Sequence, residues 1–460
     1  MVSIIFMRIR MFLTPANIIK TVLYFKRNGL KNTYFALLER IEEKKKNNYT
    51  YEEPSQKVLD EQREDKLSIS PLISIVVPCY ETKPVYLEDL ILSIEEQSYS
   101  NYEIILADAS ETSVVKKVSD ELNELYSNIT YVKIGENKGI SDNTNVGIDA
   151  ANGDYIALLD HDDVLTKDAL YYVVKEIEKT ESKGISPILV YTDEDKTDTY
   201  LDTYYEPNFK KKINLDLIMT NNYVCHLAVY KSEVIKKLRL RHKFDGAQDF
   251  DLVLRTIHLA MDEYKDKWRD YIVHIPRVLY HWRCHEKSTA ANPASKNYAY
   301  ENGRKAVNDF IKTMGWKCTV SNMKHVGFYR VDYIDGVLKA RDDVGAIGGP
   351  VFNKKYITGG AMNAKGEVLY KGLRREFSGY LHRASLSQDV EALDIRNISV
   401  KKQYWKLFSD ETGLSYPIVK NEINKYSEEE IINKSIRFCN KLRHKGVLLY
   451  YDPCYSNEEI

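Results

Sequence analysis

The sequence predicts an α/β fold in which a mostly parallel sheet is flanked by helices on both faces. Short apolar segments alternate with segments of helical periodicity between about residues 71 and 160. The apolar segments are rich in β-branched residues and lack polar alternation, which is typical of strands buried on both faces. Strands that alternate with helices at short spacing usually lie parallel in one sheet.

Each predicted strand in this region ends in polar residues. The strands are expected at 71–81, 102–110, 128–136 and 154–160, with helices at 85–98, 113–126 and 141–151 between them. Ligands of open α/β sheets bind beyond the carboxyl ends of the strands. We therefore expect one rim, lined by the polar segments 78–81, 108–110, 135–139 and 160–163.

The overall composition excludes several classes of protein. The chain has 460 residues, of which 43% are apolar and 29% charged, as expected for a globular protein of two to four domains. A net charge of −1 argues against a protein that binds nucleic acid through its overall charge. A GxGxxG loop after the first strand and a GxxxxGK[ST] loop are both absent from the sequence. The six cysteines form no CxxC pair, which favours free thiols in a reducing cytosol.

Composition changes along the chain suggest three segments. We expect a basic, helical N-terminal segment and linker at 1–70, a main α/β domain at 71–320 and a C-terminal α/β domain at 321–460. The sequence is expected to carry neither a membrane span nor a signal peptide. Residues 1–46 mix Lys and Arg with apolar residues. This pattern fits either an amphipathic helix on an anionic membrane surface or a helical cap docked on the main domain.

In the stretch YIALLDHDDVLTKDAL, a predicted apolar strand is followed at once by three carboxylates, Asp160, Asp162 and Asp163. Carboxylates at this spacing on a turn can converge on one hard cation. Mg²⁺ or Mn²⁺ typically takes one or two carboxylates and completes its shell with substrate phosphate oxygens. The alternative is a solvated acidic turn in which Asp163 caps a helix.

Six motifs occur in the order seen in family 2 glycosyltransferases. They are ISIVVPCYE, EIILADASE, NKGISDNTNVGIDAANGDYIALLDHDD, VYTDEDK, GAQDFDLVLR and HIPRVLYHWRCHEKSTA. The chain thus resembles these inverting enzymes of the GT-A type, a Rossmann-like fold, over about residues 70–316. It looks most similar to bacterial members that build rhamnose-rich and other surface polysaccharides.

The resemblance implies a nucleotide site at the first strands. Tyr80, after Pro78, would lie against the base, with Glu81 nearby. Asp108 would accept hydrogen bonds from the base. Relatives often have an arginine before the fourth strand, where Lys138 is the nearest basic residue in this chain.

The resemblance also assigns the diphosphate and the metal. Asp160 and Asp162 would hold the ribose–diphosphate and a Mn²⁺ or Mg²⁺ ion, with Asp163 supporting or also binding the metal. Arg283 and His285 form an R-x-H motif after a strand. Guanidinium suits diphosphate oxygens and imidazole suits Mn²⁺, so Arg283 is expected at the donor and His285 at the metal.

Asp249 is the candidate catalytic base. An inverting transfer needs one carboxylate to take the proton of the acceptor hydroxyl, and the family position for it reads GAQDFDLVLR here. The alternative for Asp249 is a helix N-cap. Asp251 is expected to anchor the helix together with Arg255.

Four further residues are weaker candidates for the site. Asp193 and Asp195 of YTDEDK are expected near the donor sugar, His281 competes with His285 for the metal, and Ser288 would add a hydroxyl group.

The expected activity is a hexosyl or deoxyhexosyl transfer from a UDP- or dTDP-sugar to a growing cell-surface polysaccharide or an undecaprenyl-linked acceptor. The protein would work in the cytoplasm or peripherally at the cytoplasmic face of the inner membrane, without nucleic acid. Two alternatives stay open. One is a non-catalytic glycan-binding scaffold on the same fold, and the other is a sugar nucleotidyltransferase, against which the first-strand loop VVPCYETKP argues.

Residues 336–460 resemble the second half of such a domain. EALDIRNISVKKQYWKLF parallels NNYVCHLAVYKSEVIKKL at 221–238, and the position of the base reads Asn433-Lys434-Ser435. We interpret this region as a degenerate half-domain that does not catalyse; an unrelated α/β appendage is the alternative.

Overall fold

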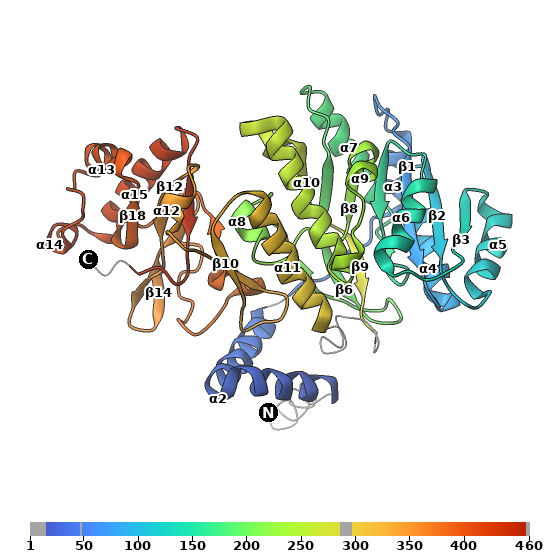
Figure 1. Cartoon of the computed structure of the whole chain (residues 1–460), viewed down its shortest axis with the longest axis horizontal. Helices are drawn as coiled ribbons and strands as arrows, with labels where there is room; N and C mark the ends of the chain where they lie inside the picture. The colour runs from blue at the N-terminus through green and yellow to red at the C-terminus, as the bar shows by residue number, and fades with distance from the viewer. Residues whose placement is uncertain (1–14, 47, 286–296, 457–460) are drawn as a thin grey trace. The chain divides into compact units, whose positions relative to one another are not determined.

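The computed structural model describes residues 15–46, 48–285 and 297–456, and its internal contacts divide the chain into two units (Figure 1). The central unit comprises residues 48–213 and 222–310. The terminal unit comprises 214–221 and the described residues among 1–47 and 311–460. Each unit has a hydrophobic core of its own.

A nine-stranded mixed sheet forms the middle of the central unit. Its order is β3-β2-β1-β4-β8-β6-β9-β5, with β7 added beside β6. The strands are β1 (Ile73–Cys79), β2 (Tyr102–Asp108), β3 (Ile129–Lys133), β4 (Tyr155–Leu158), β5 (Val164–Leu165), β6 (Leu189–Thr197), β7 (Tyr204–Asn208), β8 (Ala228–Lys231) and β9 (Ile272–Arg283). The four strands predicted from the apolar segments are β1 to β4, which confirms those predictions.

Strand direction changes at several positions within the sheet, where β8, β5 and β7 run antiparallel to their neighbours. Strands β3, β2, β1 and β4 are parallel, as are β6 and β9, whereas β8 runs antiparallel to both β4 and β6. The amino end of β8 therefore lies beside the carboxyl end of β4. This arrangement brings the segment before β8 to the rim where the parallel strands end.

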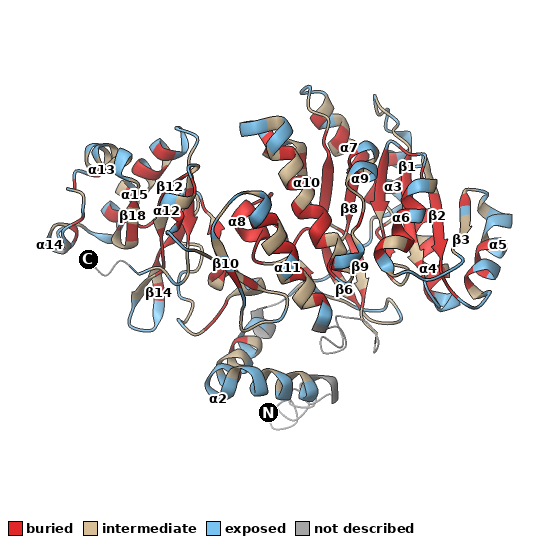
Figure 2. Cartoon of the chain, viewed as in Figure 1, coloured by how far each residue is buried: buried red, intermediate tan, exposed pale blue. Residues whose placement is uncertain are grey.

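Helices pack against this sheet and complete a mixed α/β fold, as the sequence predicts. Burial is concentrated along the strands and on the inward sides of the helices (Figure 2). The helices are α3 (Gln56–Glu64), α4 (Pro84–Glu95), α5 (Val114–Tyr126), α6 (Ile140–Ala150), α7 (Ala169–Glu181), α9 (Ser232–Leu238), α10 (Gln248–Tyr264) and α11 (Asn297–Thr313), the last of which ends in the terminal unit. Short 3₁₀ turns occur at His242–Phe244 and Lys265–Tyr271.

The terminal unit has a four-stranded sheet of order β16-β19-β12-β18. Its strands are β10 (Cys318–Asn322), β11 (Tyr329–Tyr333), β12 (Val344–Gly348), β13 (Val351–Asn353), β14 (Tyr356–Gly359), β15 (Ala361–Met362), β16 (Gln388–Asp389), β17 (Ala392–Leu393), β18 (Ile398–Val400) and β19 (Leu448–Tyr451). Its helices are α2 (Pro15–Lys46), α8 (Leu215–Ile218), α12 (Val337–Ala340), α13 (Trp405–Thr412), α14 (Lys420–Ile423) and α15 (Glu428–Arg443). Short 3₁₀ turns lie at Tyr380–Ser385, Ile395–Asn397 and Lys402–Tyr404.

The strand pairing of the terminal unit repeats part of the central unit. β12 pairs antiparallel with β18 and parallel with β19, just as β6 pairs antiparallel with β8 and parallel with β9. A longer helix precedes the last strand in each case, α15 before β19 and α10 before β9. This shared order supports the proposal that residues 336–460 descend from a half-domain.

Two further predictions concern cysteines and membrane spans. All six cysteines are free. Among the described residues, every helix is too short or too polar to cross a membrane.

Candidate active site

Three aspartates occupy the turn between β4 and β5. Asp160 is about half exposed, Asp162 is largely buried and Asp163 is fully buried. The Tyr280 hydroxyl donates to Asp163 Oδ2 at 2.5 Å, and the Arg283 backbone N–H donates to Asp163 Oδ1 at 2.7 Å. Asp163 therefore ties the turn to β9 and does not cap a helix.

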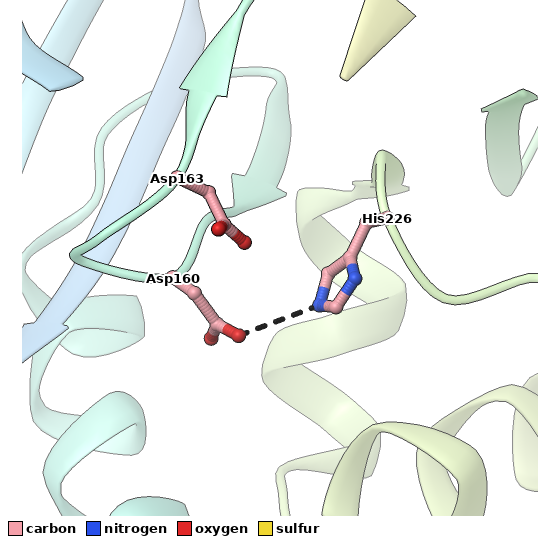
Figure 3. Close-up of side chains that lie close together, drawn as sticks. All are labelled: Asp160, Asp163 and His226. Carbon is pink, nitrogen blue, oxygen red and sulfur yellow. Dashed lines mark ion pairs between the residues drawn. The ribbon is translucent and has the colours of Figure 1, made fainter. Parts of the chain in front are cut away.

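The side chain of His226 lies next to this turn. This residue precedes β8, and the antiparallel register pairs Leu158 with Ala228, so two further residues along each chain bring position 226 opposite position 160. The His226 Nε2 atom lies 3.5 Å from Asp160 Oδ2, and its Nδ1 atom lies 3.6 Å from Glu194 Oε2. Figure 3 shows the side chains of Asp160, Asp163 and His226 close together, with the Asp160–His226 ion pair marked.

Sequence reasoning missed His226. The signal was present in NNYVCHLAVY, where a histidine stands two residues before an apolar strand. Using it would have required knowing that this strand runs antiparallel to the strand before the aspartates, which local sequence does not report.

The three aspartates place negative charge close to the buried carboxyl group of Asp163. Burial raises the pKa of Asp163 well above its ordinary value, and the carboxylates of Asp162 and Asp160 raise it further. For His226, burial opposes the charged form, but Cys225 and the Asp160 carboxylate favour it, and the pKa is raised well above its ordinary value. A positive charge at this turn is therefore stabilising.

The donor atoms around the turn fit a divalent cation. Ligand atoms of Asp160, Asp163 and His226 lie within 4.8 Å of one another. The Nε2 atom of His285 lies 2.8 Å from Asp162 Oδ2, which adds a second carboxylate–imidazole pair from the same turn. Carboxylate oxygens suit Mg²⁺ and Mn²⁺, and imidazole suits Mn²⁺ among these two ions.

Asp249 lies in the first turn of α10 and faces the segment that precedes β8. Its Oδ2 atom accepts a hydrogen bond from Asn222 Nδ2 at 2.7 Å and contacts the Cys225 thiol at 2.9 Å. The N-cap position of α10 is Ala247, so Asp249 is not the cap. The adjacent residues Cys225 and His226 thus contact Asp249 and Asp160, respectively, and one short segment links the two carboxylates.

Asp251 anchors α10 through two arginines. Its carboxylate is buried and receives hydrogen bonds at 2.9 Å from the Nε atoms of both Arg241 and Arg255. The structure therefore agrees with the structural role expected for Asp251.

Lys210 holds the segment before β8 in place. Its side chain is fully buried, and its ammonium donates to the carbonyl oxygens of Val224, Cys225 and His226. It also lies 3.4 Å from Glu194 Oε2. One cation thus fixes the backbone that carries both the Asp249 contact and the Asp160 contact.

Replacing Lys210 with Met should lower the free energy of unfolding by about 3 kcal/mol, because it leaves buried carbonyls and a buried carboxylate without their cation. Urea unfolding followed by circular dichroism measures the loss. Lys212→Met, which removes an exposed ammonium two residues away, is the matched control and should change little. Equal stability of the two variants would show that the Lys210 contacts contribute nothing.

The residues predicted to meet the nucleotide base lie after β1 and β2. Tyr80 follows β1 and is 47% exposed, and Pro78 is half-buried within that strand. Asp108 is fully buried at the end of β2, where its Oδ2 atom accepts from the Tyr131 hydroxyl at 2.7 Å and its Oδ1 atom accepts from the Ser110 N–H at 2.9 Å.

Glu81 shapes the loop between these two strand ends. Its φ is 47°, and its carboxylate accepts hydrogen bonds from the N–H groups of Glu111 and Thr112. These hydrogen bonds, chiefly those from Thr112, lower the pKa of Glu81. Lys138 is exposed, just before α6. The roles of Tyr80, Glu81 and Lys138 at a nucleotide stay predictions.

Arg283 is buried at the end of β9. Its Nη1 atom donates to Asp89 Oδ2 at 2.8 Å, and its guanidinium lies over the Tyr86 ring at 4.7 Å. Its Nε and Nη2 atoms are buried without a hydrogen-bond partner among the described residues. Arg283 thus contacts the aspartate turn through its backbone N–H, which donates to Asp163. A contact of its guanidinium with a diphosphate stays a prediction.

The weaker candidates on β6 form buried pairs with histidines of β9. Asp193 pairs with His274 at 2.8 Å and Asp195 with His281 at 2.5 Å. Because His281 is engaged in this way, it is not brought to the aspartate turn as His285 is. Ser288 lies outside the described residues.

Parts of the chain are similar to known proteins. Residues 74–239 match the family model described as glycosyl transferase family 2. An uncharacterized protein y4gI from Sinorhizobium fredii is 38% identical over 251 residues, covering 54% of this chain and 26% of that protein. The O-antigen biosynthesis protein RfbC of Myxococcus xanthus is 28% identical over 283 residues, covering 61% of this chain and 21% of that protein. The chain thus spans about a quarter of the length of these two relatives.

Solved structures give weaker matches. The S. aureus protein TarS, residues 1–349, has a TM-score of 0.38 at 17% identity, covering 52% of this chain and 65% of that chain. The mannosyltransferase PcManGT from Pyrobaculum calidifontis, solved with GDP-Man and Mn²⁺, has a TM-score of 0.36 at 17% identity, covering 56% of this chain and 80% of that chain.

Proposed function

Residues 74–239 match glycosyl transferase family 2, and on that premise we propose that the chain is an inverting transferase of this family with a nucleotide-diphosphate-sugar donor. The donor is a UDP- or dTDP-sugar carrying a hexose or deoxyhexose. The acceptor is a growing cell-surface polysaccharide or an undecaprenyl-linked glycan. The reaction takes place in the cytoplasm, at the cytoplasmic face of the membrane that carries a lipid-linked acceptor.

One observation carries this proposal. The segment before β8 contacts Asp249 through Cys225 and Asp160 through His226. A carboxylate suited to proton abstraction is thus held next to the carboxylate turn suited to a diphosphate. An inverting transfer needs these two groups on opposite sides of one anomeric carbon.

In the proposed reaction, Asp249 takes the proton of the acceptor hydroxyl as its oxygen bonds to the anomeric carbon. The bond from that carbon to the diphosphate oxygen breaks at the same time, and the diphosphate leaves with the electron pair. The hydrogen bond from Asn222 orients the Asp249 carboxylate for this proton transfer. His226 and the Asp160 turn hold the leaving diphosphate end of the donor.

A divalent cation fits the same proposal. Asp160, Asp163 and His226, or Asp162 with His285, would hold Mn²⁺ or Mg²⁺ through oxygen and nitrogen donors. When bound, the ion would neutralise negative charge that develops on the diphosphate.

Calorimetric titration with UDP and with dTDP, each with and without Mn²⁺, tests the donor proposal. We expect at least one nucleotide to bind about tenfold or more tightly when Mn²⁺ is present, because the cation screens the repulsion between the diphosphate and the aspartates. Binding of neither nucleotide under either condition would contradict the proposal and favour a glycan-binding scaffold.

A further inference from the structure

Helix α2 carries its large apolar side chains on its solvent-exposed side. The helix consists of two segments joined at Gly29, where φ is 74°. Many of its residues are exposed (Figure 2). The exposed apolar residues are Ile18, Ile19, Val22, Leu23, Phe25, Leu30, Tyr34, Leu37 and Ile41.

The spacing of these residues places them on continuous ridges. Positions 18, 22 and 25 in the first segment, and 30, 34, 37 and 41 in the second, recur every three or four residues. Positions 19 and 23 widen the ridge of the first segment to two rows. An ordinary surface helix would turn these rows toward the protein core.

Polar groups make the contacts of α2 with its own unit. Asn28 Nδ2 donates to the Lys324 carbonyl at 3.0 Å, and the Glu39 carboxylate accepts from the N–H groups of Ser378 and Gly379 at 2.6 Å each. The Tyr24 ring lies 5.6 Å from the His325 ring. The helix is thus docked through polar groups and the rings of Tyr24 and Phe35, and the more exposed apolar residues lie outside these contacts.

The charged residues before Glu39 are all basic, whereas Glu39, Glu42 and Glu43 lie in the last part of α2. Residues 1–38 contain six basic residues and no acidic one. Lys26 and Lys31 are exposed on either side of the kink at Gly29. A second copy of the same helix would bring like charges together, whereas an anionic surface would attract them.

We propose that the exposed face of α2 binds an anionic phospholipid surface, with the apolar ridges inserted among the acyl chains and the lysines at the headgroups. Apolar residues on one face and cations at its border are the pattern of helices that lie in a membrane interface. The contact is independent of the transfer reaction, so each can be tested without the other.

Co-sedimentation of the full chain with vesicles tests this surface. We expect binding to phosphatidylglycerol-containing vesicles and about tenfold or weaker binding to pure phosphatidylcholine. The double variants Val22→Ser/Phe25→Ser and Lys26→Glu/Lys31→Glu should each lower the partition onto anionic vesicles about tenfold or more. Leu125→Ser, at a 72% exposed apolar site on α5, is the matched control and should bind like the wild type.

Three outcomes would overturn the proposal. They are failure of the wild type to bind anionic vesicles, wild-type binding by both α2 variants, and a dimer in light scattering that only the α2 variants dissociate. Nucleotide titration of the same samples reports the donor site separately, so a loss of lipid binding with intact nucleotide binding concerns α2 alone.

Discussion

Asp249→Asn should abolish sugar transfer while leaving donor binding nearly unchanged. The amide keeps the shape of the side chain but cannot accept the proton of the acceptor hydroxyl. General-base catalysis is typically worth about 10²- to 10⁴-fold, so we expect turnover to fall by about 10³-fold. Transfer of labelled sugar from the donor measures the rate, and calorimetry with the nucleotide measures binding.

Asp262→Asn is the control for this variant because it removes an exposed carboxylate from the same helix. It should transfer sugar at the wild-type rate. Normal turnover by Asp249→Asn would show that another group takes the proton. Loss of nucleotide binding together with turnover would instead give Asp249 a role in shaping the site.

Asp160→Asn should weaken nucleotide binding in the presence of Mn²⁺ by about 100-fold. The substitution removes a carboxylate from the candidate ligand set and also removes the charge that faces His226 at 3.5 Å. Loss of a group that only supports a metal ligand typically costs about 10- to 100-fold in affinity, so loss of a ligand should reach the upper end.

The matching control is Asp120→Asn on α5, an exposed aspartate paired with Lys116. It should bind nucleotide and Mn²⁺ like the wild type. If Asp160→Asn binds nucleotide equally well with and without Mn²⁺, and as tightly as the wild type, the assignment of a cation to this turn is wrong.

The first half of the central sheet could be predicted from the sequence because its strands are local and uniformly apolar. Residues Ile73, Ile75, Val76 and Val77 are completely buried in β1, and their β-branched side chains mark a central strand without knowledge of its neighbours. The reversal of β8 between β4 and β6 could not be predicted, because it depends on pairing between segments about 70 residues apart.

The same distinction explains what was found and missed in the site. Asp160, Asp162 and Asp163 are adjacent in sequence and could be predicted as one charged turn. His226 reaches that turn only through the β4–β8 register, so it was missed. Asp249 stands in a local sequence motif, whereas its contact with Cys225, which links it to the turn, depends on the fold.

The terminal unit has a serine at the position that corresponds to the proposed catalytic base of the central unit. In the central unit, Asp249 contacts the segment before β8. In the terminal unit, Ser435 of α15 contacts the segment before β18, and its hydroxyl accepts a hydrogen bond from the Ile395 N–H at 3.1 Å. Ser435 belongs to the stretch Asn433-Lys434-Ser435, which corresponds in sequence to the position of the catalytic base. A serine hydroxyl is too weak a base to replace the carboxylate, which fits the proposal that this unit does not catalyse.

The most direct test of the central claim is release of nucleoside diphosphate from a panel of donors: dTDP-rhamnose, UDP-glucose, UDP-galactose and UDP-N-acetyl sugars. The wild type, supplied with Mn²⁺ and a membrane extract as acceptor, should turn over at least one of these donors, and chelation of the metal or Asp249→Asn should abolish the release. Release from no donor, or equal release by wild type and Asp249→Asn, would contradict a metal-assisted transferase with Asp249 as its base.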